Sequence, residues 1–177
     1  MVVASTIQAP QPPSAAQPLC DNLCWLLSRA SYALTTELTA AFEDIGLSPR
    51  AHAVLTAAMS GDRSQTELAR MVGLDKTTMV VTLDELEAAG LAERRPSSVD
   101  RRARVIVVTP AGVRKVREAE EIAERIRADV LATLAPGDRE AFVRALGLLV
   151  SDRLAEPVPC AHPVRRRAPR GISDRTR

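Results

Sequence analysis

The sequence is poor in aromatic residues and has few cysteines. Phe, Trp and Tyr make up 2% of the 177 residues, so a hydrophobic core must be built from aliphatic side chains. This argues against an aromatic-rich β-sandwich and against a stacking platform for single-stranded nucleic acid. Three cysteines without a CxxC pair are too few for a disulfide scaffold and do not form a zinc motif.

The sequence also lacks the segments and motifs of several functional classes. No apolar run approaches the roughly 20 residues of a membrane-spanning helix, and the first residues do not have the basic and apolar regions of a signal peptide. The P-loop, GxGxxG, GxSxG and HExxH signatures are absent, and the only histidines are His52 and His162. We therefore expect a cytoplasmic protein that is not an enzyme and uses neither a metal nor another cofactor.

Charge is distributed unevenly along the chain. The formal net charge is +2, but the last 17 residues contain six arginines and one aspartate, which leaves −3 for the rest. A mildly acidic body binds nucleic acid only where positive charge is concentrated locally. The stretch ERRPSSVDRRAR, residues 93–104, has five arginines and two acidic residues. It is therefore the candidate for such a concentration.

Prolines divide the chain into two tails and one folded region. Four of the twelve prolines lie in residues 1–18 and four in residues 157–169, where too little apolar surface is present to offset the entropy of ordering. We therefore expect disordered tails over 1–18 and 154–177. The folded domain is expected over 19–153.

Apolar residues at spacings of three and four, together with capping residues, predict six helices in this domain. The predicted helices span residues 20–45, 49–60, 65–72, 76–89, 110–134 and 137–153. The predicted N-caps are Ser48, Ser64 (in a capping box with Glu67), Asp75 and Thr109. Glycines expected in the left-handed conformation after helices are Gly46, Gly61, Gly73 and Gly90.

The hydrophobic period changes between the fourth and fifth helices. Residues 91–95 and 104–108 predict two β-strands joined by a polar turn. Just before them, helix 65–72, a three-residue turn and helix 76–89 have the proportions of a helix-turn-helix. The predicted fold class is therefore mainly α with a small β part. It is a winged helix-turn-helix over 48–108 within a domain of six helices and a two-stranded wing.

This module predicts a surface that binds double-stranded DNA. Its second helix enters the major groove with its N-terminal residues at the base edges, and arginines at the wing tip reach the adjacent minor groove. A solvated helix in a bundle would give a similar helical pattern, but the arginine-rich hairpin directly after it favours DNA. The predicted DNA-binding residues are Ser64, Gln65, Thr66, Lys76, Thr77, Thr78, Val80, Val81, Thr82, Arg94, Arg95, Asp100, Arg101, Arg102 and Arg104.

The sequence resembles the MarR family of transcriptional regulators over residues 19–153. The resemblance is carried by SQTELARMVGLDKTTMVVTLDELEAAGLAERRPSSVDRRARVIVVTPAG, and above all by DKTTMV, LDELEAAGL, the D-x-R of the wing and VTPAG. It implies a regulator, by default a repressor, in which Asp100 holds Arg102 for insertion into the minor groove. Many relatives have a polar residue at position 80 and an arginine at 81. This chain has valines there, which can contact only thymine methyl groups.

The resemblance also implies a homodimer held by its first and last helices on a pseudo-palindromic operator. A physical reason supports the dimer, because the dimerisation helices 20–45 and 110–153 carry more apolar surface than one small winged module can cover. Burial against an identical copy gives a twofold interface. Twofold symmetry then predicts half-sites about 10 base pairs apart.

Two kinds of input signal remain open, and the first is thiol oxidation. The string DNLCWLL resembles the OhrR branch of organic-hydroperoxide sensors, whose reactive cysteine would match Cys24. The tyrosines that hydrogen-bond the thiolate in that branch are replaced here by Ser28 and Pro49. In a dimer, Cys160 could form an intersubunit disulfide with Cys20 or Cys24. The alternative interpretation is that Cys24 is a small buried hydrophobe.

The second candidate input is a small aromatic or phenolic effector. The resemblance implies a ligand cleft between the first, second and fifth helices, where Arg29, Tyr32 and His52 could offer a cation, a hydroxyl and an imidazole. The alternative roles are a surface ion pair for Arg29 and a structural role for His52. A different function also remains open: a winged helix used for protein–protein contact without specific DNA binding. The retained basic wing argues against it.

Overall fold

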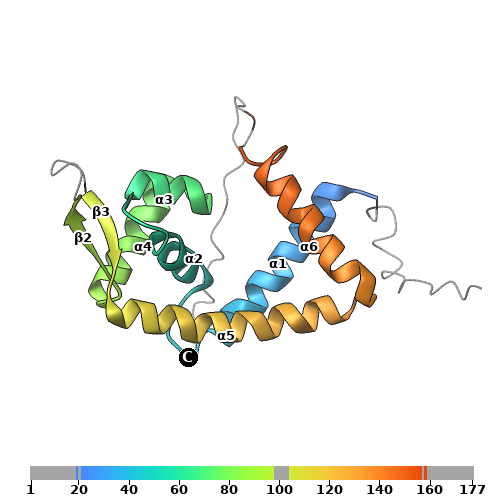
Figure 1. Cartoon of the computed structure of the whole chain (residues 1–177), viewed down its shortest axis with the longest axis horizontal. Helices are drawn as coiled ribbons and strands as arrows, with labels where there is room; N and C mark the ends of the chain where they lie inside the picture. The colour runs from blue at the N-terminus through green and yellow to red at the C-terminus, as the bar shows by residue number, and fades with distance from the viewer. Residues whose placement is uncertain (1–18, 20, 98–103, 157, 159–177) are drawn as a thin grey trace, which may run out of the picture. The chain divides into compact units, whose positions relative to one another are not determined.

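The computed structural model describes residues 19, 21–97, 104–156 and 158 (Figure 1). The chain forms two compact units that divide between Val130 and Leu131. The elements, in chain order, are α1 (Leu23–Ala41), α2 (Pro49–Ala58), β1 (Arg63–Ser64), α3 (Gln65–Val72), α4 (Lys76–Ala88), β2 (Ala92–Pro96), β3 (Arg104–Val108), α5 (Pro110–Ala132) and α6 (Pro136–Ser151). The mainly helical winged fold predicted from the sequence is therefore confirmed. The predicted tails fall almost wholly outside the described residues.

Local capping chemistry sets where most helices begin. Each of the four predicted N-caps accepts a hydrogen bond from the backbone N–H three residues further on, so all four are confirmed. They are Ser48, Ser64, Asp75 and Thr109. Of the four glycines, Gly46, Gly73 and Gly90 have the predicted left-handed φ, whereas Gly61 has a φ of 128° and lies outside that region.

The first helix is shorter than predicted. α1 begins after Asn22, whose side-chain oxygen accepts a hydrogen bond from the Trp25 N–H at 2.9 Å, and it ends at Ala41. Phe42 and Leu47 are buried in the turn that follows. Ile45, the last residue of the apolar period that predicted a longer helix, also lies in this turn and packs against the core.

The β part is a three-stranded antiparallel sheet in the order β1-β3-β2, where the sequence predicted two strands. β2 and β3 pair from Ala92 opposite Val108 to Pro96 opposite Arg104. β1 adds a two-residue strand on the other side of β3, too short to give an alternating pattern in the sequence. Pro96, predicted in the turn, is the last residue of β2. The sheet places β2 at the edge of the wing.

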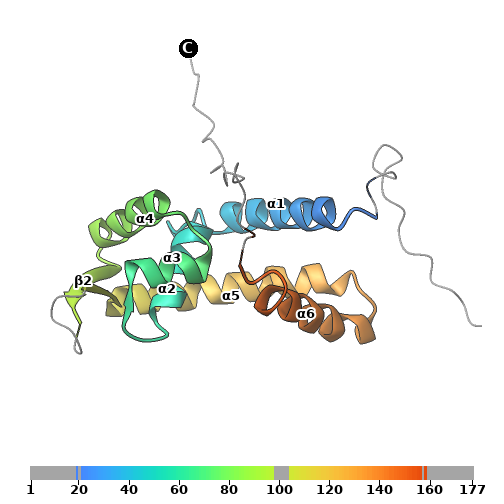
Figure 2. The same cartoon turned by 90° about the horizontal axis from the view of Figure 1, so that it is seen from above.

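The core of the first unit lies where α2, α3 and α4 gather beside the strands, as Figures 1 and 2 both show. It is built almost entirely from aliphatic side chains, as the composition predicted. The fully buried apolar residues are Phe42, Val54, Leu55, Leu68, Met79, Leu83, Val116 and Ala119. The last two belong to α5, so the first half of this helix is packed into the same core as the winged module.

Neither α1 nor α6 buries a residue within the described chain. The exposed large apolar side chains on these two helices are Leu23, Leu26, Tyr32 and Leu34 of α1, and Phe142, Val143, Leu148, Leu149 and Val150 of α6. Among the described residues, no helix is both long and apolar enough to cross a bilayer.

Candidate nucleic-acid interface

The N-terminal turn of α4 presents two exposed polar side chains, Lys76 and Thr77. The helix begins at the N-cap Asp75, whose carboxylate accepts hydrogen bonds from the Thr78 hydroxyl at 2.6 Å and the Thr78 N–H at 2.9 Å. These hydrogen bonds hold the pKa of the Asp75 carboxyl below its usual value, the one from the hydroxyl contributing most. The turn that carries Lys76 and Thr77 is therefore fixed by a charged cap. The Thr78 hydroxyl proton is already used within that cap.

One predicted DNA contact on α4 is wrong. Thr82 is 1% exposed, and its hydroxyl donates a hydrogen bond to the Thr78 carbonyl oxygen at 2.8 Å. It lies on the same helix face as Met79, Leu83 and Leu86, which are also buried. A threonine can enter a core in this way because its methyl group packs while the preceding turn satisfies its hydroxyl. Thr82 therefore cannot reach a ligand on the outer surface.

The two valines that follow the first turn of α4 differ in exposure. Val81 is 48% exposed, whereas Val80 is half-buried. An exposed valine on this helix offers an apolar surface and no hydrogen bond. It is suited to contact with the methyl group of thymine and unsuited to phosphate.

The start of α3 mainly serves the fold. Ser64 forms the predicted capping box with Glu67: the Ser64 hydroxyl donates to the Glu67 carboxylate at 2.7 Å and accepts from the Glu67 N–H at 3.3 Å. The Ser64 N–H donates to the same carboxylate at 2.8 Å. These bonds lower the pKa of Glu67. Of the three DNA contacts predicted here, Ser64 and Gln65 are half-buried, and Thr66 is exposed.

The described arginines of the wing differ in their surroundings. Arg94 forms ion pairs with Glu87 and Asp84 of α4, whereas Arg95 pairs with Glu93 on its own strand. Arg104, at the start of β3, is exposed. The predicted wing-tip residues Asp100, Arg101 and Arg102, and with them the expected ion pair between Asp100 and Arg102, lie outside the described residues.

The sequence interpretation missed the acidic partners of Arg94 and the junction that joins the wing to α5. The Thr109 hydroxyl donates to the Gly90 carbonyl oxygen at 2.8 Å, and the Thr109 N–H donates to that of Leu91 at 3.0 Å. A Cβ atom on Gly112 would lie 2.1 Å from the Leu91 carbonyl oxygen. The string VTPAG contained the signal, because a glycine in the first turn of a long helix is unfavourable unless another backbone approaches it closely.

His52, one of the predicted effector residues, is half-buried on α2. Its ring meets the Phe42 ring edge-on at 5.5 Å, and within the described chain its buried Nε2 has no hydrogen-bond partner. Burial lowers the pKa of His52, and the nearby Glu120 carboxylate opposes that shift. The other two candidates, Arg29 and Tyr32, are exposed on α1.

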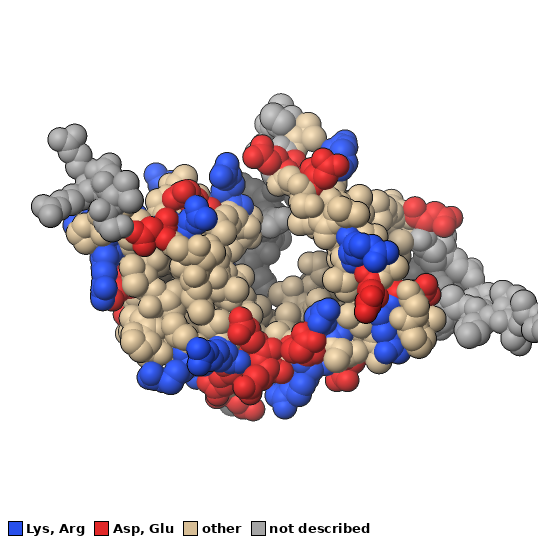
Figure 3. Space-filling model, viewed as in Figure 1, with Lys and Arg blue, Asp and Glu red and all other residues tan. Residues whose placement is uncertain are grey.

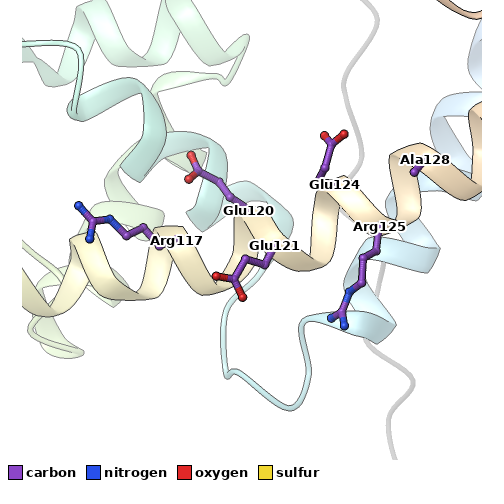
Figure 4. A pocket seen from close by; sticks show the side chains of 6 residues that line it. All are labelled: Arg117, Glu120, Glu121, Glu124, Arg125 and Ala128. Carbon is purple, nitrogen blue, oxygen red and sulfur yellow. The ribbon is translucent and has the colours of Figure 1, made fainter.

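An open, charged groove follows α5. Figure 4 shows Glu120 and Glu124 pointing to one side of the helix and Glu121 and Arg125 to the other; Arg117 and Ala128 complete the lining. Figure 3 shows acidic and basic side chains interleaved along the edge of the molecule where α5 runs. A surface with alternating charges does not favour a polyanion. The DNA-binding candidates therefore remain those on α3, α4 and the wing.

Of the three redox candidates, the described residues include Cys24, which is exposed and not in a disulfide. Its interpretation as a buried hydrophobe is wrong for the single chain. Cys20 and Cys160 lie outside the described residues. The described part of the chain contains no cluster of three His, Cys, Asp or Glu side chains that could hold a metal ion.

Comparison with known proteins identifies the same module. The model of the MarR family matches residues 45–103. Among solved structures, CouR from Rhodococcus jostii RHA1 bound to p-coumaroyl-CoA is 26% identical, with a TM-score of 0.68 over 80% of this chain and 97% of that one. The transcriptional repressor CouR bound to a 23-mer DNA duplex is 25% identical, with a TM-score of 0.69 over 80% and 99% of the two chains.

Two further similar proteins are associated with small aromatic acids. The MarR family protein Rv2887 of Mycobacterium tuberculosis, in complex with p-aminosalicylic acid, is 30% identical, with a TM-score of 0.62 over 72% of this chain and 97% of that one. BpsR of Bordetella bronchiseptica, whose DNA binding is regulated by 6-hydroxynicotinic acid, is 25% identical, with a TM-score of 0.67 over 80% and 99%. The similarity extends over nearly the full length of these proteins.

Proposed function

The chain belongs to the MarR family and is a DNA-binding transcriptional regulator, and from that membership we propose that it acts as a homodimeric repressor. In this proposal two winged modules bind a pseudo-palindromic operator in double-stranded DNA. Binding of a small aromatic acid releases the protein from this operator. The first turn of α4 and the wing make the DNA contacts.

The observation that carries this proposal is the set of exposed side chains on α4 and on the neighbouring wing. Lys76 and Thr77 are exposed at a helix N-terminus that a charged N-cap holds in place, and the helix dipole there favours phosphate. Val81 adds an exposed apolar surface. Arg95 and Arg104 are exposed or partly exposed on the strands of the wing. A helix of this kind fits the width of the major groove, and the similar CouR has been solved on a DNA duplex.

The unburied faces of α1 and α6 support the homodimer. Soluble chains rarely leave extended apolar patches in water, and such patches mark interfaces. Tyr32 on α1 is 65% exposed and Leu148 on α6 is 64% exposed. A second copy of this chain is the simplest partner, because twofold association buries the same patch on both copies.

The proposed effector is a small aromatic acid that reaches His52. The buried Nε2 of His52 has no hydrogen-bond partner among the residues that the structure describes, and such an atom is stabilised by a ligand that offers it a hydrogen bond. The Phe42 ring packs at a steep angle against the His52 ring and fixes its position. In this proposal Arg29 attracts the carboxylate of the acid, and the Tyr32 hydroxyl donates a hydrogen bond to it. Among similar proteins, Rv2887 forms a complex with p-aminosalicylic acid, and 6-hydroxynicotinic acid regulates the DNA binding of BpsR.

The experiment starts from a duplex selected by the full chain from a random pool. p-Aminosalicylic acid and 6-hydroxynicotinic acid are then titrated against the protein–DNA complex, with hydrogen peroxide as a separate arm. The proposal predicts release by at least one acid and a weaker effect of that acid on His52→Gln. Release by peroxide alone, lost in Cys24→Ser, would replace the aromatic effector with thiol oxidation. Failure to enrich any duplex would overturn the DNA-binding proposal itself.

A further inference from the structure

We infer that Arg94 is a positioning residue that fastens the wing to α4 and does not itself contact DNA. Its partners are Glu87 and Asp84, both on α4. This inference rests on the proposed binding of DNA by α4 and the wing, and it assigns to Arg94 a role different from the one that its place in an arginine-rich hairpin suggests.

Arg94 is held at three points. Its backbone N–H donates a hydrogen bond to Glu87 Oε1 at 2.7 Å. Its guanidinium pairs with the other oxygen of the same carboxylate through Nη1, and its Nη2 lies 2.7 Å from Asp84 Oδ1. Both ends of the residue are therefore tied to a single helix, and that helix is the one proposed to enter the major groove.

The place of β2 in the sheet explains why the backbone bond matters. β2 is an edge strand, because the order of the sheet is β1-β3-β2. Arg94 pairs with Ile106 of β3 on one side, so a backbone group on the other side has no neighbouring strand. The Glu87 carboxylate accepts a hydrogen bond from this Arg94 N–H and so attaches the outer edge of the wing to α4.

The charges and exposures at this cluster argue against a phosphate contact. Arg94 with Glu87 and Asp84 carries a net charge of −1, so the three together repel a polyanion. The Arg94 side chain is 28% exposed, whereas that of Arg95 is 58% exposed. Successive residues of a strand point to opposite faces, so Arg94 faces α4 and Arg95 faces away from it. For Arg94 to bind phosphate, it would have to leave two carboxylates unpaired.

The two neighbouring arginines provide a matched test. Arg94→Gln and Arg95→Gln are compared with the wild type by fluorescence anisotropy on the selected duplex over a series of salt concentrations. Each protein–phosphate contact contributes about −0.9 to the slope of log affinity against log salt. A positioning role predicts that Arg94→Gln lowers affinity by about tenfold at every salt concentration, leaving the slope unchanged. Arg95→Gln is expected to make the slope shallower.

Glu87→Gln separates the two roles by the sign of its effect. The glutamine oxygen can still accept the Arg94 N–H, so the fold is preserved, but the ion pair with Glu87 is lost while the one with Asp84 remains. A positioning role predicts weaker DNA binding although a negative charge has been removed. A direct phosphate contact predicts tighter binding, because one carboxylate in place of two then competes with the phosphate for Arg94. Glu85→Gln, an exposed acid on the same helix, controls for the change in charge.

The possible failures are distinguishable. If the wild type binds the duplex with a normal salt slope, but Arg94→Gln makes that slope shallower or leaves affinity unchanged, the inference on Arg94 is overturned and the proposed function stands. Unchanged or tighter binding by Glu87→Gln, relative to Glu85→Gln, overturns it as well. If the wild type shows no salt-dependent binding, it is the proposed function that fails.

Discussion

The backbone at Gly112 approaches Leu91 so closely that a side chain at position 112 has no room. A Cβ atom there would lie 2.1 Å from the Leu91 carbonyl oxygen and 2.7 Å from a methyl carbon of Val108. Leu91 follows α4, and Gly112 lies in the first turn of α5. This contact therefore joins the DNA-binding module to the long helix that leaves it.

Gly112→Ala is expected to lower the free energy of unfolding by about 2 kcal/mol, because neither backbone can move without disturbing the junction. The sign is informative, since alanine is otherwise the better residue in a helix. Gly137→Ala is the matched control, because a Cβ at Gly137 meets nothing within 4 Å; it should be neutral or slightly stabilising. Urea unfolding of both variants checks this, and equal stabilities would contradict the close approach.

Two threonines on α4 should respond differently to loss of the hydroxyl. Thr77 is exposed beside the N-cap, whereas Thr82 is buried and bonded to the preceding turn. Thr77→Val should weaken DNA binding by about fivefold, the value of one lost hydrogen bond. Thr82→Val should change affinity by less than about twofold. Anisotropy titrations of both variants decide the matter, and equal losses would restore Thr82 as a DNA contact.

His52 makes the stability of the fold depend on pH in a defined direction. Its pKa is lowered in the folded protein, chiefly by burial, so below the unfolded-state value of about 6.5 the unfolded chain binds more protons. Stability is therefore lost as pH falls through that value toward the lowered pKa of the folded state. The free energy of unfolding should fall more between about pH 7.5 and pH 5 in the wild type than in His52→Gln.

Acid-induced loss from Glu67 and Asp75, whose pKa values are also lowered, is common to both proteins and cancels in this comparison. Identical pH profiles for the wild type and His52→Gln would show that His52 is not desolvated in the folded chain.

The exposed apolar face of α6 should be needed for self-association. Phe142 and Leu149 lie seven residues apart and so share one side of the helix. The double variant Phe142→Glu and Leu149→Glu should sediment as a single copy, whereas the wild type should sediment as a dimer. Arg144→Glu, at an exposed polar position of α6, tests whether added negative charge alone has this effect. A wild type that sediments as one copy would contradict the proposed dimer.

Most of the architecture could be predicted because it depends on local signals. Ser48, Ser64, Asp75 and Thr109 each cap a helix as their side chains favour, and the arginine-rich hairpin follows from the change to a two-residue period. What could not be predicted depends on contacts between distant segments. The two-residue strand β1 exists because β3 lies beside it.

The candidate site shows the same division. Lys76 and Thr77 were predicted from their place at the start of the helix and are exposed, whereas Thr82 was wrongly predicted to lie off the buried face. Helical spacing from Met79 places Thr82 on the buried face. The partners of Arg94 lie seven and ten residues before it on another element. The sequence therefore could not show that Arg94 is already paired with two carboxylates.

The central claim is that two copies of this chain hold duplex DNA through the first turn of α4 and the wing. The most direct test is the affinity and stoichiometry of the full chain on a duplex selected from a random pool, measured by anisotropy between about 50 and 200 mM salt. We predict two protomers per duplex and an affinity that falls steeply, with a slope of about −0.9 for each phosphate contacted. A flat salt dependence, or one protomer on a duplex without a repeated half-site, would contradict it.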